Sequence, residues 1–409
     1  MKTIAFLLAL FLTSTLFGQD QEGKKEIMVI HSEVYKTDRK IAVYLPPNYE
    51  ALKDEKLQVV YLFDGQWEDL FNYVTSTLSY LASIGEAKNM IVVGIYAQDR
   101  QSEFTPNAIN EETKTRWKNP KIGLSALLDN HLRTEVFPLI AKKYNVENYR
   151  LGIGHSLGGT YLINSFSENS KLFNAYIAIS PNLEYDNYEI LMKAERLLKT
   201  DSKINSFLNV SVGDSDDYEK FFYRGVKQLD SILSAVKVNG LKFNFDYLRN
   251  EDHLSSPLTE LPKALRLFAK LTAKPSSSEV SKILGDESLS LYEEIKKRYN
   301  ELEEWLGYQF QPTEDDLNRI AYIALSNKKA DEGVRILNWA IELYPNGINL
   351  YDSKAEMLEN LSRSKDAKNS LKLGLVKLEA TKLTMSNERY DYFKKILDEH
   401  LERLNKSSH

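Results

Sequence analysis

Short runs rich in β-branched and aromatic residues alternate with longer amphipathic or polar stretches from Lys25 to Phe245. In chain order the runs read EIMVI, KIAVYLP, LQVVYLF, MIVVGIY, YRLGIG, AYIAIS, FLNVSVG and KFNFDYL. The middle runs are apolar throughout, which is typical of central strands that helices cover on both faces. The alternation therefore predicts an α/β fold with a mostly parallel central sheet.

Composition limits the classes of function. The chain has 409 residues, enough for two or three domains, and its 53 Lys and Arg against 58 Asp and Glu give a net charge of -5. Without a basic excess, nucleic acid is not an expected partner. There is no cysteine, which excludes disulfides, thiolate nucleophiles and zinc–thiolate sites. Covalent chemistry must therefore use another nucleophile.

The first 18 residues have the layout of a secretory signal. Lys2 precedes an apolar stretch from Ile4 to about Phe17, and the small Gly18 follows. A membrane span needs about 20 apolar residues, which neither this stretch nor any later segment supplies. We expect a cleaved signal peptide at residues 1–18 and a mature protein in the periplasm or outside the cell. A buried N-terminal helix is the alternative.

The pattern changes at TAKPSSSEV, residues 272–280, after which every segment reads as helix. This predicts a first domain over residues 25–272 and an α-helical domain over residues 280–409. Within the second, four pairs of positions lie 34 residues apart: Gly333 and Ala367, Leu337 and Leu371, Ala340 and Gly374, Ile341 and Leu375. The spacing resembles the tetratricopeptide repeat, and we expect a protein partner or self-association there. A generic helical appendage is the alternative.

Residues 149–160, YRLGIGHSLGGT, place a serine between a strand and a helix. In the G-x-S-x-G spacing, Gly154 and Gly158 leave room for a tight turn that holds Ser156 strained and exposed. The helix that follows directs its N–H groups and dipole at charge that develops on a substrate oxygen. The context of strand and helix predicts Ser156 as a nucleophile, although a glycine-rich turn after any strand can look the same.

A serine needs a base to remove its proton, and in this arrangement the histidine follows the serine in the chain. Three of the six histidines come after Ser156, namely His253, His400 and His409. His409 is the last residue, and His400 lies in a helix that reads as exposed. The predicted base is therefore His253, in the polar loop NEDHLSSP after a strand.

The acid is expected after the preceding strand. FLNVSVGDSDDY places Asp214, Asp216 and Asp217 there, and one carboxylate would orient the imidazole and stabilise its cation. Asp216 is the first choice and Asp217 the second. A calcium site is the alternative reading of these aspartates, but the rest of an oxygen-ligand loop is missing. We expect neither a metal nor an organic cofactor.

An oxyanion hole needs two N–H donors. We expect one from Leu157, the residue after the nucleophile. The other is expected from Gln66 in the DGQWED loop after the third run, where Gly65 permits a sharp turn. Trp67 follows at the mouth and either lines an acyl or aryl pocket or belongs to the core.

These segments together resemble the putative esterase family, α/β-hydrolases that include esterase D, enterochelin esterases and feruloyl esterases. The resemblance covers roughly residues 25–272 and rests on VVYLFDGQW, LRTEVFPLIAKKYNVENYRLGIGHSLGG and NEDHLSSP. It implies a three-layer sandwich with Ser156 as nucleophile, His253 as base, and Gln66 and Leu157 as oxyanion donors. Family members use Asp or Glu as the acid, and many carry a tetratricopeptide-like tail.

The resemblance also suggests substrate contacts at Gly65, Trp67 and Arg100. One motif departs from the family, whose members often show R-x-R-D-x-T-P. In DRQSEFTPN, Ser102 and Glu103 replace the second arginine and the aspartate, so the substrate contact that this arginine makes elsewhere does not carry over.

We therefore expect a serine carboxylic-ester hydrolase that works through an acyl-enzyme. Siderophore trilactones, feruloyl or acetyl esters of plant polysaccharide, and simple acyl esters are the substrate classes left open. The alternative is an inactive hydrolase-like scaffold that binds a partner through its helical repeats.

Overall fold

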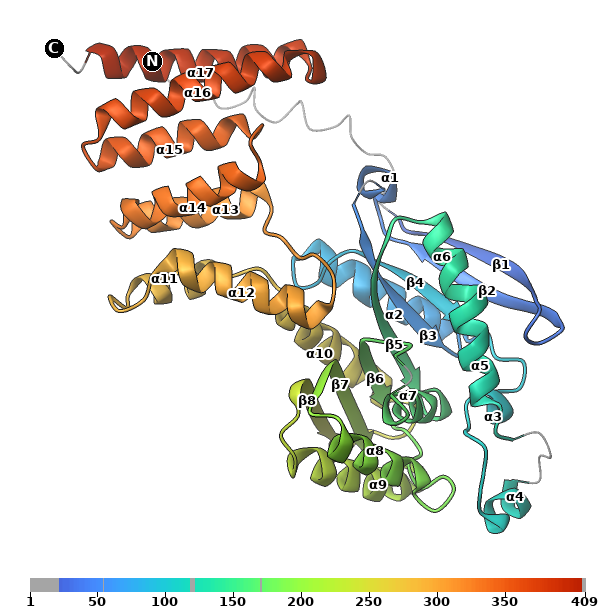
Figure 1. Ribbon diagram of the computed structural model, residues 1–409. Coiled ribbons are helices and arrows are strands. Elements are labelled where there is room, and N and C mark those ends of the chain that lie inside the picture. Colours follow the sequence, from blue (N-terminus) through green and yellow to red (C-terminus); the bar gives the residue numbers. More distant parts are fainter. Residues whose placement is uncertain (1–21, 54, 118–121, 170, 407–409) are drawn as a thin grey trace, which may run out of the picture. The chain divides into compact units, whose positions relative to one another are not determined.

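The computed structural model describes residues 22–53, 55–117, 122–169 and 171–406. The predicted signal peptide at residues 1–18 lies outside the described residues. The chain divides into two compact units between Thr272 and Ala273, and Figure 1 draws both. The first unit is built on an eight-stranded sheet, and the second is built from helices.

The sheet of the first unit is mostly parallel. Its order is β1-β2-β4-β3-β5-β6-β7-β8, in which β1 pairs with β2 and β2 with β4 antiparallel while every other pair is parallel. Each apolar run of the sequence forms one strand, so the predicted fold class is confirmed. The strands are β1 (Lys24–Ser32), β2 (Thr37–Leu45), β3 (Leu57–Phe63), β4 (Met90–Ile95), β5 (Val146–His155), β6 (Ala175–Ile179), β7 (Lys203–Gly213) and β8 (Asn239–Leu248).

Helices cover both faces of the sheet, which explains why the central runs are mostly apolar. Every residue of β3 and β4 is buried. On one face α2 (Glu68–Ser83) packs with α10 (Ser256–Leu271); on the other α7 (Leu157–Ser167) packs with α8 (Glu189–Thr200), and α8 with α9 (Asp217–Ser234) (Figure 1). The layers are those of an α/β-hydrolase sandwich.

The remaining helices of the first unit lie in its connections. The predicted helix before β5 is present as α5 (Ser125–His131), the π-helical turn η1 (Leu132–Val136) and α6 (Phe137–Lys143). Its apolar side is fully buried at Leu132 and Val136. The short helices are α1 (Tyr49–Leu52), α3 (Arg100–Glu103) and α4 (Glu111–Trp117).

The parallel order brings four loops to one edge of the sheet. The carboxyl ends of parallel strands share an edge, and such sheets bind their ligands there. The loops after β3, β5, β7 and β8 contain Gln66, Ser156, Asp216 and His253 in turn. The topology thus collects residues that are far apart in the sequence.

In the second unit, successive helices pack side by side (Figure 1). The positions that lie 34 residues apart take matching places in α14 and α16, where Leu337 and Leu371 are fully buried. The helices are α11 (Ser277–Leu284), α12 (Leu291–Leu306), α13 (Glu314–Ser326), α14 (Ala330–Leu343), α15 (Ile348–Asn360), α16 (Ser364–Thr381), the 3-10 turn η2 (Lys382–Thr384) and α17 (Asn387–Lys406).

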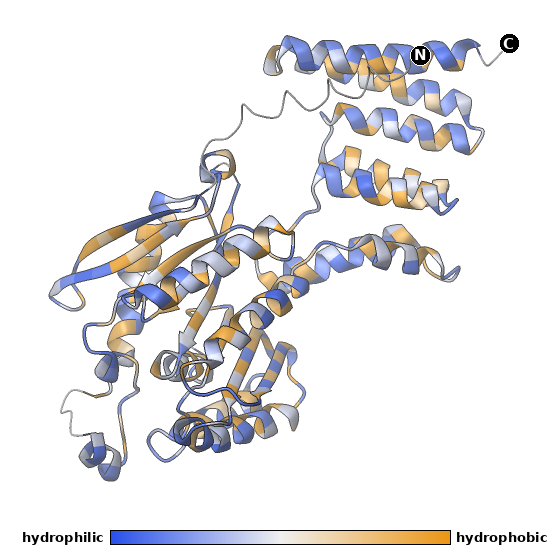
Figure 2. Ribbon diagram, turned by 180° about the vertical axis from the view of Figure 1, so that it is seen from behind, coloured by the Kyte–Doolittle hydropathy of each residue, from blue (hydrophilic) through white to orange (hydrophobic). Residues whose placement is uncertain are grey.

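Each unit has its own cluster of buried hydrophobic residues. Figure 2 shows hydrophobic residues along the strands and, on the helices, hydrophobic residues interspersed with hydrophilic ones. Within the described ranges, no helix combines the length and hydrophobicity that crossing a membrane requires.

Leu337→Ala should destabilise the helical unit by about 2–5 kcal/mol, because it leaves a cavity in a core. Hydrogen exchange followed by mass spectrometry should show faster exchange in α13 to α15. Leu208→Ala is the matched control, since Leu208 is fully buried in β7, and it should speed exchange in the sheet instead. If Leu337→Ala loosened the sheet and not the helices, the division into two cores would be wrong.

Candidate active site

Ser156 occupies the turn between β5 and α7. Its backbone angles, φ 57° and ψ -121°, lie in a region that residues other than glycine rarely adopt. The Ser156 N–H donates to the carbonyl oxygen of Ile179 at 2.9 Å, which fastens the turn to β6. A Cβ atom at Gly154 would lie 2.4 Å from the carbonyl carbon of Gly158. Only glycine therefore fits where the strand passes the start of the helix.

His253 lies in the loop after β8, beside this turn. The rings of His253 and His155 are 4.6 Å apart between centroids, and His155 Nε2 donates to the His253 carbonyl oxygen at 2.7 Å. Burial lowers the pKa of His155 to about 3, so the ring is neutral and its Nε2 carries the proton that the carbonyl oxygen accepts. His155, the residue before Ser156, thus ties the histidine loop to the serine turn.

The carboxylate that pairs with the His253 ring belongs to Glu219. Its Oε1 lies 2.6 Å from His253 Nδ1. Glu219 is fully buried in the first turn of α9, and its Oε2 accepts hydrogen bonds from Ser180 Oγ at 2.9 Å and from the Gly213 N–H. These contacts hold the carboxylate in one orientation toward the imidazole.

The structure differs from the sequence prediction here, because the carboxylate that contacts the imidazole is that of Glu219 and not that of Asp216. Asp216 is the N-cap of α9, where its Oδ1 accepts the Glu219 N–H at 2.7 Å and its Oδ2 accepts the His253 N–H at 2.9 Å. Its carboxylate therefore positions both partners through their backbones. Asp214 accepts a backbone N–H of the histidine loop, and Asp217 has an exposed side chain.

One signal in the sequence could have identified Glu219. The pattern D-x-x-E at the start of a helix places an acid three residues after the N-cap, from which its side chain reaches back toward the helix start. The histidine loop arrives at that helix start. The sequence prediction instead favours an aspartate directly after the strand.

The turn after β3, where Gln66 was predicted as an oxyanion donor, lies against the serine turn. A Cβ atom at Gly158 would approach Asp64 Oδ2 at 3.7 Å and Phe63 Cβ at 3.1 Å. Among the described residues, no protein acceptor receives the backbone N–H of Gln66 or of Leu157. Both groups are therefore free to bind a substrate oxygen, which is the role that the sequence predicts for them.

The three residues predicted to contact substrate lie at or beside this turn. A Cβ atom at Gly65 would be 2.5 Å from Gly94 Cα. The absence of a side chain at Gly65 therefore lets the turn pack closely against β4. Trp67 is 40% exposed at the start of α2. The Arg100 guanidinium lies 4.8 Å from the centre of the Trp67 ring and donates to both carboxylate oxygens of Asp64, at 3.0 and 2.8 Å. Substrate contacts at these residues stay predictions.

A pocket of about 700 Å³ opens at Ser156. Tyr218 and Phe222, on its wall, also contact the His253 ring, with centroids 5.7 and 5.4 Å from it. The wall is formed by Arg100, Gln101, Glu112, Thr113, Arg116, Trp117, Ser156, Leu157, Asn182, Glu184, Tyr185, Asp186, Asn187, Asp217, Tyr218, Phe221 and Phe222. The predicted site residues outside this wall are Gly65, Gln66, Trp67, Asp216 and His253.

In the described part of the chain, no group of three or more His, Asp or Glu side chains is placed to hold a metal ion.

Gly154→Ala should lower the free energy of unfolding by about 3 kcal/mol, because the new methyl group meets backbone atoms that cannot move aside. Urea unfolding gives the measurement. Gly85→Ala is the control: its φ is 76° but nothing lies within 4 Å of the added Cβ, so its cost should be about 1 kcal/mol. If Gly154→Ala lowered the free energy of unfolding no more than Gly85→Ala does, the close packing at this turn would be contradicted.

Comparison with known proteins agrees with the fold. Residues 32–212 match the family described as "Putative esterase". The ferri-bacillibactin esterase BesA of Bacillus subtilis (strain 168) is 23% identical over 227 residues, which cover 51% of this chain and 77% of the relative.

Two solved structures share the architecture. An IroE-like serine hydrolase from Shewanella oneidensis is 20% identical with a TM-score of 0.62, covering 78% of this chain and 100% of its own. An uncharacterised protein from Capnocytophaga ochracea is 17% identical with a TM-score of 0.71, covering 94% of this chain and 100% of its own, and therefore extends over both units. The two structures show the shared fold, while the two sequence matches make residues 32–212 similar to the putative esterase family and support a carboxylic-ester hydrolase.

Proposed function

We propose that the chain hydrolyses esters through an acyl-enzyme formed on Ser156, with His253 as the base and Glu219 as the acid that orients it. The observation that carries the proposal is the 2.6 Å contact between His253 Nδ1 and Glu219 Oε1, in a loop tied to a serine at φ 57°. A strained serine between a strand and a helix is typical of a nucleophile at the top of an α/β-hydrolase sheet.

The first step is attack on the ester. Glu219 favours the His253 tautomer with its proton on Nδ1, which leaves Nε2 to take the proton of Ser156 as Oγ attacks the carbonyl carbon. Glu219 also stabilises the imidazolium that results. In the described part of the chain Ser156 Oγ has no hydrogen-bond partner, and such catalytic contacts often tighten only when substrate binds.

The second step releases the products. The negative charge that develops on the carbonyl oxygen is held by the N–H groups of Gln66 and Leu157, and one such donor is worth about 10²–10³ in rate. The alcohol leaves with the proton from His253. Water then attacks the acyl-enzyme, with His253 again as the base, and the carboxylic acid leaves Ser156 free.

Among ester classes we propose a siderophore trilactone as the substrate. One support is the relative at 23% identity that is named a ferri-bacillibactin esterase. The other is the pocket, whose wall includes the rings of Trp117, Tyr218 and Phe221. Aromatic side chains offer faces and edges against which an aromatic group of a ligand can pack.

We also propose a cellular location for the protein and a role for its second unit. The signal-like residues 1–18 support action in the periplasm or outside the cell. The 34-residue spacing between α14 and α16 supports a tetratricopeptide-like unit that binds a protein partner or a second copy of the chain.

Ser156→Ala should lower kcat on a siderophore trilactone by at least about 10⁴-fold, because the covalent route is lost. Product release followed by chromatography gives the rate. Ser231→Ala is the matched control, because its hydroxyl faces solvent on α9 and bonds only within that helix; it should keep full turnover. Full turnover by Ser156→Ala would mean another nucleophile.

The same assay on a feruloyl ester and a short-chain aryl ester tests the substrate class. The trilactone should have the highest kcat/KM of the three. A higher kcat/KM for either of the other esters would contradict the proposed substrate class but not the proposed acyl-enzyme mechanism. An intact chain that cleaves none of them would favour the inactive scaffold.

Glu219→Gln should lower kcat by about 10³–10⁴-fold, because the amide cannot stabilise the imidazolium or fix its tautomer. Asp216→Asn should cost less than about tenfold, since Asn remains a good N-cap. Steady-state kinetics of the two variants decides between the two acids. The reverse order of effects would restore Asp216 as the acid.

A further inference from the structure

A buried ion pair joins β2 to the short helix α3. Arg39 and Glu103 are 2% and 3% exposed, and both terminal nitrogens of the guanidinium donate to the carboxylate, Nη1 to Oε1 at 3.0 Å and Nη2 to Oε2. The Arg39 guanidinium also lies 4.2 Å from the centre of the Tyr35 ring. Burying two charges is costly and is weak evidence for stability, so the position of the pair needs another explanation.

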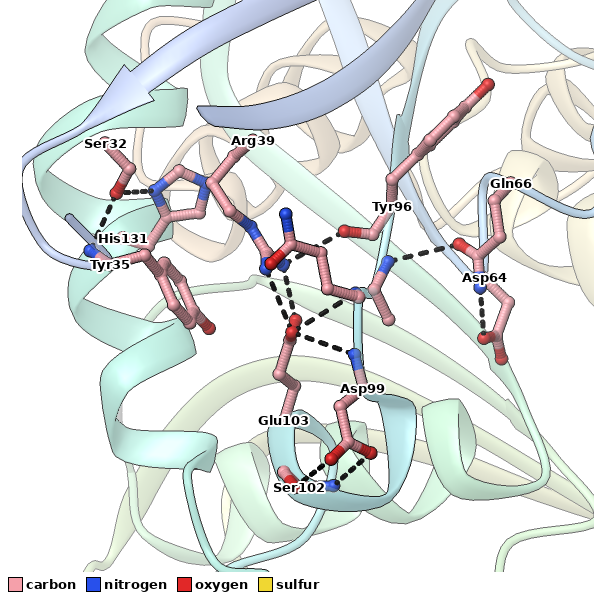
Figure 3. A network of polar contacts seen from close by, with 12 residues as sticks. Ser32, Tyr35, Arg39, Asp64, Gln66, Tyr96, Asp99, Ser102, Glu103 and His131 are labelled. Carbon is pink, nitrogen blue, oxygen red and sulfur yellow. Dashed lines mark hydrogen bonds and ion pairs between the residues drawn. The ribbon is translucent and has the colours of Figure 1, made fainter. Parts of the chain in front are cut away.

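The pair fixes the backbone of residues 96–103, here called the bracing segment. Arg39 Nη2 donates to the Tyr96 carbonyl oxygen at 3.0 Å. Glu103 Oε1 accepts the N–H groups of Gln98 and Asp99, both at 3.2 Å. Figure 3 shows the Tyr96 contact at the Arg39 guanidinium and the other backbone contacts at the Glu103 carboxylate. Each end of the ion pair therefore holds backbone groups of one short stretch of chain.

The bracing segment in turn holds the oxyanion turn, residues 64–67. The Ala97 N–H donates to Gln66 Oε1 at 3.1 Å, and Gln66 Nε2 donates to Asp64 Oδ1 at 3.1 Å (Figure 3). Arg100 contributes its two hydrogen bonds to Asp64. Asp64 needs this support, since it is fully buried at φ 61°, a strained region for a residue other than glycine.

We infer that Arg39 and Glu103 are positioning residues for the oxyanion hole, acting on Gln66 and Asp64 through the bracing segment. The inference rests on the proposed function, in which the Gln66 N–H binds the oxyanion. Such a donor must lie about 2.7–3.1 Å from the oxygen. A small displacement of the turn therefore weakens binding of the transition state more than binding of the substrate. Glu103, which departs from the family motif, thereby gains a role within the fold.

The test compares Glu103→Gln and Arg39→Met with the unaltered full chain, using 4-nitrophenyl acetate hydrolysis. Each variant should lower kcat at least about tenfold while KM changes less than about threefold, because the lost interaction acts in the transition state. The pH of half-maximal kcat should stay the same, because neither residue contacts the base His253. A pair that is merely structural would lower stability and leave kcat unchanged.

A third variant guards against loss of folding. The double variant Arg39→Met/Glu103→Leu replaces the ion pair by apolar side chains, an exchange that is often neutral or stabilising. The leucine side chain, however, cannot accept hydrogen bonds from the N–H groups of Gln98 and Asp99. This double variant should fold with cooperative unfolding and remain slow. Wild-type kcat in the folded double variant would overturn the inference.

Glu135→Gln is the matched control. Glu135 is a carboxylate that is 13% exposed and accepts hydrogen bonds from Ser32 Oγ and the Val34 N–H, in the same region but without a hydrogen bond to the bracing segment. It should lose stability and keep kcat. An equal fall of kcat in Glu135→Gln would show that loss of any largely buried carboxylate in this region slows the enzyme. That result would refute a specific role for Arg39 and Glu103.

The Ser156→Ala variant separates failure of the inference from failure of the proposed function. If Ser156→Ala is inactive and Glu103→Gln has wild-type kcat, only the positioning role is wrong. If Ser156→Ala retains turnover, the mechanism on which the role rests is wrong.

Discussion

The backbone of Ser156 is held at φ 57° and ψ -121°, and the rest of the active site is arranged around this one strained position. The turn exists because Gly154, which has no Cβ, allows strand β5 to pass within contact distance of Gly158 at the start of α7. His155 then ties the histidine loop to it, and Gly158 brings the β3 turn alongside. Every proposed catalytic group is therefore positioned relative to the same short turn.

Much of this could be predicted from local patterns. Apolar runs indicated the strands because central strands buried on both faces are mostly apolar. The glycines around Ser156 marked the turn because the constraint is steric and acts between near neighbours in the chain. His253 followed from chain order once the fold class was known. Each of these inferences needed only sequence spacing and a known topology.

Contacts between distant residues could not be predicted in the same way. Asp216 and Glu219 both follow β7, but only the three-dimensional path of the histidine loop decides which carboxylate meets the imidazole. Asp216 was preferred for its nearness to the strand, and it serves instead as the N-cap. Likewise Arg39 and Glu103 are 64 positions apart, and no local pattern relates them.

The central claim is that Ser156 is the nucleophile of an acyl-enzyme. The most direct measurement is peptide mapping by mass spectrometry after reaction of the purified chain with a fluorophosphonate, which bonds covalently to activated serines. A single phosphonyl adduct on the peptide that contains Ser156, absent after prior heat denaturation, is the predicted result. An intact, folded chain without an adduct, or with an adduct on a different serine, would contradict the claim.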